Sequence, residues 1–371
     1  MKPNLTWNSI VFVFAIILMV TGLWACGDTD NDNRDNHIDP VDNARSYIYV
    51  TLARDGQVAV IDEATEKVVK TVDVGAGPAI IIATPDNRKV YTANWGDNTI
   101  SAIDTNTYES TTILTSINST DIVGRPFIIA MSPDGRYVYA GLFGNRIDVI
   151  NTETDTVEKY FSTDTLPASL FVSPDGGTLY VATIKGQDPA YIWGVSTEDG
   201  KQVLEPIPIG AAPGWITMSP DGTQVFALNF YSDDVSVINT QDWIVDDTIY
   251  TGEGSEGVIG NVTPDNSALY ITNLGTGDLI AIDTQSYEIQ KIPLNGRPGG
   301  VHFNEDGSHI YVTHYGPQSL ENDTNKEFLL TGVWSKTDPG YVDIIRADTG
   351  EIISEIEVGP GPTSVVGITH D

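Results

Sequence analysis

Residues 126–140, PFIIAMSPDGRYVYA, hold the pattern that decides the fold of this chain. An apolar stretch leads into Ser-Pro-Asp-Gly, and a stretch rich in aromatic and β-branched residues follows. Proline sets φ at the second turn position, aspartate bonds the backbone ahead, and glycine accepts the positive φ that often closes such a turn. The stretch therefore predicts two antiparallel strands joined by a tight turn.

The same frame recurs along the chain at intervals of roughly 45 residues. In two copies Asn87 and Asn266 stand where the others have glycine, and asparagine is the other residue that tolerates positive φ. After each hairpin come a strand ending in Asp-Thr or a variant, a polar turn and an outer strand. Four antiparallel strands per repeat are typical of a β-propeller blade, and we name them A to D from the inside out. The further copies lie at residues 78–94, 167–183, 213–229, 256–273 and 298–314.

The two ends of the repetitive region predict how the ring closes. Residues 46–52 form a B strand with no A strand before it, and residues 361–369 form an A strand with nothing after it. The last strand then completes the first blade, which removes the exposed sheet edge. We therefore predict an all-β fold: a seven-bladed β-propeller of four-stranded antiparallel blades over residues 46–371, closed by the C-terminal strand. B strands begin near residues 47, 89, 136, 178, 224, 268 and 309.

The N-terminal segment has the features of an export signal. Lys2 precedes an apolar run at residues 10–20 that is short for a membrane span. The run ends in LWAC at residues 23–26, which resembles the lipobox of bacterial lipoproteins, whose cysteine receives the lipid. The resemblance implies a lipoprotein signal peptide at residues 1–25 and lipidation of Cys26. The alternative is a plain secretory signal with an incidental cysteine.

Residues 26–45 predict an acidic, flexible tether, because they carry almost no apolar side chains. Asp28, Asp30 and Asp32 look like the start of a calcium loop, but Asn33 and Asp39 stand where that loop needs glycine and glutamate. Gly27, and not aspartate, follows the cysteine. By the lipoprotein resemblance this implies the outer membrane, on either its periplasmic or its cell-surface side.

The charge of the chain is strongly negative, with 51 acidic against 19 basic residues and a formal net charge of −32. Such a field repels nucleic acid and anionic lipid, so we expect no nucleic-acid partner and membrane contact through the lipid anchor alone. It attracts cations or cationic partners; the alternative is that it serves solubility. Because Cys26 is the sole cysteine, packing and strand pairing alone must hold the propeller together.

The second strands carry a four-residue motif that recurs along the chain. Residues 270–273 read YITN, and variants occur at residues 91–94, 226–229 and 311–314. With the Ser-Pro-Asp-Gly turn and the strands ending in Asp-Thr, this resembles the YVTN-repeat family of β-propellers, which includes YncE-like exported bacterial proteins. The resemblance spans residues 46–371 and implies the fold. Its signature residues are structural and imply no activity.

The best candidate binding site is the mouth of the central channel, where the D–A and B–C loops share one face. Aromatic side chains around a concave mouth with a few basic groups suit an anionic or sugar-like ligand. The alternative is that the arginines neutralise nearby acids and the aromatics fill gaps between blades. The candidates are Arg54, Trp95, Arg125, Phe143, Lys185, Trp215, Tyr231, Arg297 and Tyr315.

The B–C loop of the last blade is unusually long, running from about residue 316 to 340. Loops of this length inside a compact fold are usually functional or disordered. We expect a lid or docking element, with Phe328, Leu329, Leu330 and Trp334 as its apolar contacts.

No cofactor, metal or catalytic set is predicted. Residues 252–257, GEGSEG, match a dinucleotide fingerprint but lead into a strand and not a helix. Hairpin spacing places His302 opposite residues 309–310, near His309, but a metal needs more ligands than this pair. We expect an envelope-anchored binding or scaffolding propeller, with a small molecule or an envelope protein as partner. The alternative is a propeller enzyme, either a lactonase-like hydrolase or a relative of oxidoreductases.

Overall fold

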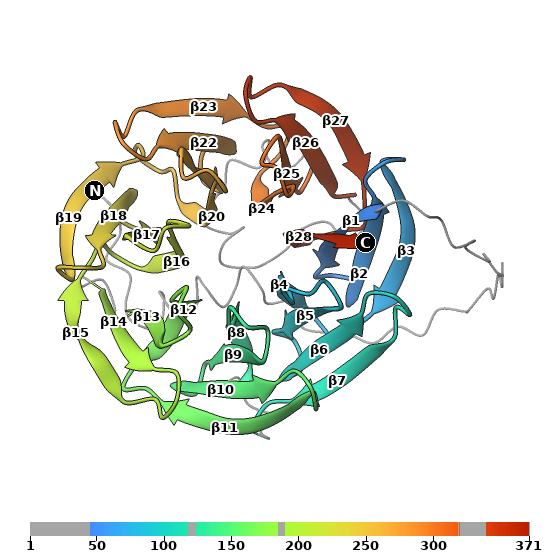
Figure 1. The fold of residues 1–371 in the computed structure, drawn as a ribbon. Helices are drawn as coiled ribbons and strands as arrows, with labels where there is room; N and C mark the ends of the chain where they lie inside the picture. The colour runs from blue at the N-terminus through green and yellow to red at the C-terminus, as the bar shows by residue number, and fades with distance from the viewer. Residues whose placement is uncertain (1–44, 118–123, 185–189, 318, 320–338, 371) are drawn as a thin grey trace.

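The computed structural model describes residues 45–117, 124–184, 190–317, 319 and 339–370. Within these residues the chain forms seven four-stranded antiparallel sheets arranged as blades around a central channel (Figure 1). The predicted seven-bladed β-propeller is therefore confirmed. No helix in the described part of the chain is long and apolar enough to cross a membrane.

Each blade runs from an inner strand beside the channel to an outer strand on the rim. The inner (A) strands are β28 (Pro362–His370), β4 (Pro78–Ala83), β8 (Pro126–Met131), β12 (Leu166–Val172), β16 (Pro213–Met218), β20 (Gly257–Val262) and β24 (Pro298–Phe303). The second (B) strands are β1 (Arg45–Leu52), β5 (Lys89–Asn94), β9 (Tyr137–Leu142), β13 (Thr178–Ile184), β17 (Gln224–Asn229), β21 (Ala268–Asn273) and β25 (His309–His314).

The two remaining strands of each blade lie farther from the channel. The third (C) strands are β2 (Gln57–Asp62), β6 (Thr99–Asp104), β10 (Arg146–Asn151), β14 (Tyr191–Ser196), β18 (Asp234–Asn239), β22 (Asp278–Asp283) and β26 (Tyr341–Arg346). The outer (D) strands are β3 (Lys67–Asp73), β7 (Ser110–Leu114), β11 (Thr156–Ser162), β15 (Gln202–Pro208), β19 (Ile244–Tyr250), β23 (Ile289–Pro293) and β27 (Ile352–Glu357).

The C-terminal strand closes the ring as the sequence predicts. Strand β28 pairs with β1 from Arg45 opposite His370 to Val50 opposite Val365, so the end of the chain forms the inner strand of the first blade (Figure 1). The contact continues beyond the first blade, because Thr363 Oγ1 donates to the Pro78 carbonyl of the second blade at 3.1 Å. The described ends of the chain therefore meet in one sheet.

The A–B turns adopt the predicted geometry. Gly135 has φ of 72°, and Asn87 and Asn266 take its place in two other turns with φ of 59° and 63°. Ser132 Oγ donates to Asp134 Oδ1 at 2.7 Å inside the turn. Here the sequence pattern and the backbone agree residue by residue.

In four blades the tyrosine of the second strand donates a hydrogen bond to the following blade. Tyr49 Oη donates to the Thr105 carbonyl at 3.5 Å, and Tyr270 Oη donates to the Ala347 carbonyl at 3.2 Å. Tyr91 Oη donates to Asp155 Oδ1 at 2.6 Å. Because each acceptor belongs to the following blade, the tyrosines position the blades relative to one another.

Candidate functional site

The channel mouth is built by the first residues of the seven inner strands. They surround a cavity of about 80 Å³, and all seven blades contribute to its lining. The residue directly after the second strand completes the wall in three blades, where Phe230, Leu274 and Tyr315 occupy that position. Phe127 and Trp215 enter from strands β8 and β16. The side chains around the cavity are largely apolar, which suits capture of an apolar group by burial of its surface.

An aromatic cluster beside the cavity holds three of the predicted residues. The ring of Trp95 meets those of Phe143 and Phe127 edge to face, with centroids 4.5 Å and 6.1 Å apart. The guanidinium of Arg125 lies 5.6 Å from the Trp95 ring centroid, within the range of a cation–π contact. Trp95 is fully buried, so it supports the wall of the mouth from behind.

Trp95 and Trp215 both bury an indole nitrogen that has no hydrogen-bond partner in the described part of the chain, and of the two only Trp215 lines the cavity. An unsatisfied buried donor costs about 1–3 kcal/mol. A ligand acceptor would recover that energy if the indole turned its buried nitrogen toward the cavity.

The predicted basic residues of the mouth have different surroundings. Arg297 is buried, and its guanidinium donates to the carbonyls of Ser319 (2.8 Å), Leu274 (2.5 Å) and Gly275 (2.9 Å). It therefore holds loops together. Arg54 lies near Tyr315: burial raises the pKa of the Tyr315 phenol, and the charge of Arg54 partly opposes that shift.

Tyr231 lies one residue beyond the cavity wall. Its ring meets the Phe230 ring at 89° with centroids 5.6 Å apart. Burial, with a smaller contribution from Glu256, raises the pKa of Tyr231 to about 12, so the phenol is neutral at physiological pH. Phe230, which comes directly after its second strand, lines the cavity, and Tyr231 does not. Trp95, Phe143 and Tyr315 occupy the same position in their own blades. This shared position is the sequence signal that points to Phe230.

Several predicted residues lie outside the described part of the chain. They are Lys185, Cys26, residues 26–44 of the predicted tether, and the lid or docking residues Phe328, Leu329, Leu330 and Trp334. Their predicted roles stay predictions. The last residue of the predicted tether, Arg45, instead begins strand β1.

His302 lies on strand β24 and lines a cavity at the end of the channel beside the A–B turns. It pairs with Tyr311 and not with residues 309–310 as hairpin spacing predicted. The turn closes between Asn304 and His309, which shifts the register. Burial lowers the pKa of His302 to about 4, so the ring is neutral at physiological pH.

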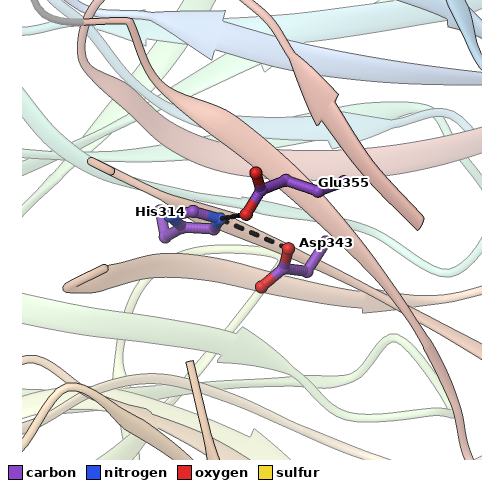
Figure 2. Close-up of side chains that lie close together, drawn as sticks. All are labelled: His314, Asp343 and Glu355. Atoms are coloured by element: carbon purple, nitrogen blue, oxygen red, sulfur yellow. Dashed lines mark ion pairs between the residues drawn. The ribbon is translucent and has the colours of Figure 1, made fainter. Parts of the chain in front are cut away.

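A second cluster of polar side chains lies in the last blade. His314, Asp343 and Glu355 come from strands β25, β26 and β27, and their ligand atoms all lie within 4.8 Å of one another (Figure 2). The sequence gives no local signal for this cluster, because the long insertion separates His314 from the two acids. The residues have the donor types that bind transition metals.

The comparisons with known proteins support the fold. No protein-family profile and no curated protein sequence matches the chain. A putative 6-phosphogluconolactonase from Bacteroides uniformis has a TM-score of 0.64 at 16% identity, covering 87% of this chain and 99% of that one. Hydrazine synthase from Kuenenia stuttgartiensis has a TM-score of 0.63 at 19% identity, covering 81% and 95%.

A third solved structure, the dihydro-heme d1 dehydrogenase NirN in complex with DHE, has a TM-score of 0.55 at 15% identity. The match covers 86% of this chain and 74% of that chain. At these identities the three likenesses show a shared propeller fold and carry no activity over to this chain.

Proposed function

We propose that this chain is a binding protein of the bacterial cell envelope that captures a ligand or partner group at the channel mouth. The observation that carries the proposal is the aromatic and apolar cavity on which all seven inner strands converge. Its named lining residues include no carboxylate, histidine or lysine. General acid–base chemistry uses such groups, whereas binding needs only a shaped surface.

The chemistry of the cavity narrows the proposed ligand class. The apolar wall favours an aromatic or branched aliphatic group, and the indole N–H of Trp215 favours a hydrogen-bond acceptor on that group. The net charge of −32 disfavours an anion. A small neutral aromatic group that carries a carbonyl oxygen fits all three properties better than the anionic or sugar-like ligand expected from the aromatic and basic residues assigned to the mouth.

The proposed setting follows from the sequence. We place the chain in the YVTN-repeat family, exported as a lipoprotein and held at the outer membrane by acyl chains on Cys26. Support comes from the lipobox-like segment and from the repeated tyrosine, whose hydroxyl stabilises contacts between blades. Two or more acyl chains give stable anchoring, and residues 26–45 would separate the propeller from the membrane.

Ligand binding is testable with the full chain in detergent. Benzamide and acetophenone are titrated while tryptophan fluorescence and heat are recorded, with glucose as the sugar comparison. We expect the two aromatic carbonyl compounds to bind and glucose to fail. The Trp215→Phe variant, which keeps the aromatic wall but loses the donor, should bind about tenfold more weakly.

Trp243→Phe is the matched control, because the Trp243 indole donates to the Glu205 carbonyl at 2.7 Å, away from the channel mouth. It should bind as the wild type does. Equal affinity of the wild type and Trp215→Phe would contradict the assigned contact.

A lactonase-like hydrolase or an oxidoreductase-related protein is the alternative function. The similarity to a putative 6-phosphogluconolactonase over 87% of the chain is the observation that favours the hydrolase. Turnover of sugar lactones by the purified chain would favour the hydrolase over the binding function.

A further inference from the structure

The buried cluster in the last blade joins three adjacent strands. His314 Nε2 lies 3.3 Å from Asp343 Oδ1 and 3.6 Å from Glu355 Oε2 (Figure 2). His314 and Asp343 are fully buried, whereas the side chain of Glu355 is 38% exposed. The cluster therefore has one side open to solvent, through which an ion could enter.

Asp343 lacks the hydrogen bonds that a buried carboxylate needs. Neither of its oxygens receives a hydrogen bond in the described part of the chain. Asp148 provides a direct comparison, because it is also fully buried and is also the third residue of a C strand. There, the Ser116 backbone N–H donates to Asp148 Oδ2 at 2.6 Å and the Ser116 hydroxyl donates to Oδ1.

The loop at the corresponding position of the last blade supplies no such donors to Asp343. Asn295 comes two residues after β23, as Ser116 comes two residues after β7. Its Nδ2 donates to Glu355 Oε2 at 3.4 Å and not to Asp343. Two carboxylates thus lie close together in an acidic protein, and that of Asp343 is fully buried. Burying such charges is costly unless they are paired or bind a metal, and a cation supplies the missing compensation.

The spacing of the three groups matches a coordination sphere. Zinc binds nitrogen and oxygen ligands at about 2.0–2.2 Å, so two ligands of a tetrahedral site lie about 3.4 Å apart. The observed 3.3 Å and 3.6 Å from His314 Nε2 bracket that value. One histidine and two carboxylates leave a fourth position on the exposed side of Glu355.

Three other blades carry asparagine at the position of His314, and there the side chain makes hydrogen bonds. Asn94, Asn229 and Asn273 end their second strands where His314 ends β25. Their Nδ2 atoms donate to side chains of the adjacent C strand, including Ser236 at 2.9 Å and Asp278 at 2.8 Å. In the last blade His314 replaces this amide donor with an imidazole that can bind a metal, beside the buried Asp343.

The ring of His314 must change its proton position when it binds a metal. The Gly316 N–H donates to His314 Nδ1 at 3.2 Å, which puts the proton of the neutral ring on Nε2. Coordination through Nε2 moves that proton to Nδ1, so the Gly316 amide must turn away. Gly316 has φ of 80°, and glycine tolerates such changes at little steric cost.

We propose that His314, Asp343 and Glu355 bind one divalent transition-metal ion that joins strands β25, β26 and β27. Residues 315–340 connect β25 to β26, so this hairpin lacks the short turn of other blades. A metal bridge at the base of the long connection would offset the entropy of closing it. The bridge fixes the last blade beside Tyr315, a residue of the channel mouth.

The test uses the full, untagged chain after treatment with EDTA. Zinc is titrated by calorimetry, and cobalt is added to record its visible absorption bands, which report the coordination geometry. We expect one ion per chain. A zinc concentration of a hundred times Kd should raise the melting temperature by about 5 °C.

The two substitutions within the cluster introduce residues that other blades have at the equivalent positions. His314→Asn introduces the residue of three other blades, and Asp343→Ser introduces the residue found at Ser101 and Ser236. Both should fold in EDTA and lose the zinc-induced rise in melting temperature. His309→Asn, on the same strand but outside the cluster, should keep it. Absence of zinc and cobalt binding by the wild type, or unchanged binding by His314→Asn, would overturn the proposal.

Discussion

Thr51 Oγ1 lies 2.7 Å from Thr363 Oγ1, a buried hydrogen bond between residues 312 positions apart. Ser364 N–H also donates to Thr51 Oγ1 at 2.9 Å. These contacts lie where the last strand enters the first blade. A chain whose single cysteine lies in the predicted anchor holds its ring shut with such bonds and with the packing of β28.

Removal of residues 361–371 should therefore destroy cooperative folding. The truncation exposes the β1 edge and removes Val365, Val366 and Ile368 from the core. Circular dichroism during heating measures the outcome, and removal of Asp371 alone is the control. A truncated chain that melts at the wild-type temperature would refute the role of the closing strand.

Tyr91→Phe should reduce the free energy of unfolding by about 1–3 kcal/mol, because the lost hydroxyl bonds a charged group. Tyr91 Oη donates to Asp155 Oδ1 of the next blade at 2.6 Å. Urea denaturation measures the loss. Phe226 shows that a phenyl ring fits the same strand position, so the variant should fold. An unchanged midpoint would mean that the hydroxyl contributes nothing to the contact between blades.

The aspartates of the A–B turns should make the protein less stable in acid. The hydroxyl of Ser132 holds the pKa of Asp134 below its ordinary value, with help from the Arg136 backbone N–H, and burial partly opposes the shift. A lowered native pKa stabilises the fold above the unfolded pKa, and that stabilisation disappears as pH falls through the native value. The loss should therefore begin near pH 4.

Comparison of the wild type with Ser132→Ala isolates this contribution, because repulsion among the other acids changes equally in both. Urea denaturation at pH 7 and pH 3 gives the two differences in free energy. The variant should lose less stability between these pH values than the wild type does. Parallel losses would show that the serine bond does not perturb the aspartate.

Cys26→Ser should release the protein from the membrane. The proposed anchor depends on acyl chains attached to this residue, the single cysteine of the chain. Fractionation of cells followed by mass spectrometry of the mature N-terminus measures both location and lipid. Wild-type protein that begins at another residue and carries no lipid would contradict the proposed processing.

Local sequence patterns predicted the fold because each blade repeats the same short-range solution. The turn residues at 132–135 and the asparagines at 87 and 266 specify backbone angles that depend on neighbours in sequence. Ring closure was also predictable, since an unpaired inner strand at one end and a missing one at the other leave one arrangement without a free edge. Trp95, Phe143 and Tyr315 were placed near the mouth by the same strand count.

The sequence by itself determined the number of blades, the turns and the face on which the loops gather, because these depend on strand order and local propensity. Only the tertiary structure decided which mouth residue faces the cavity, since a shift of one residue turns a side chain to the opposite side. It also decided that Arg297 bonds backbone carbonyls and that His314 meets Asp343 and Glu355. Those contacts join residues from different strands and loops, and packing in three dimensions selects them.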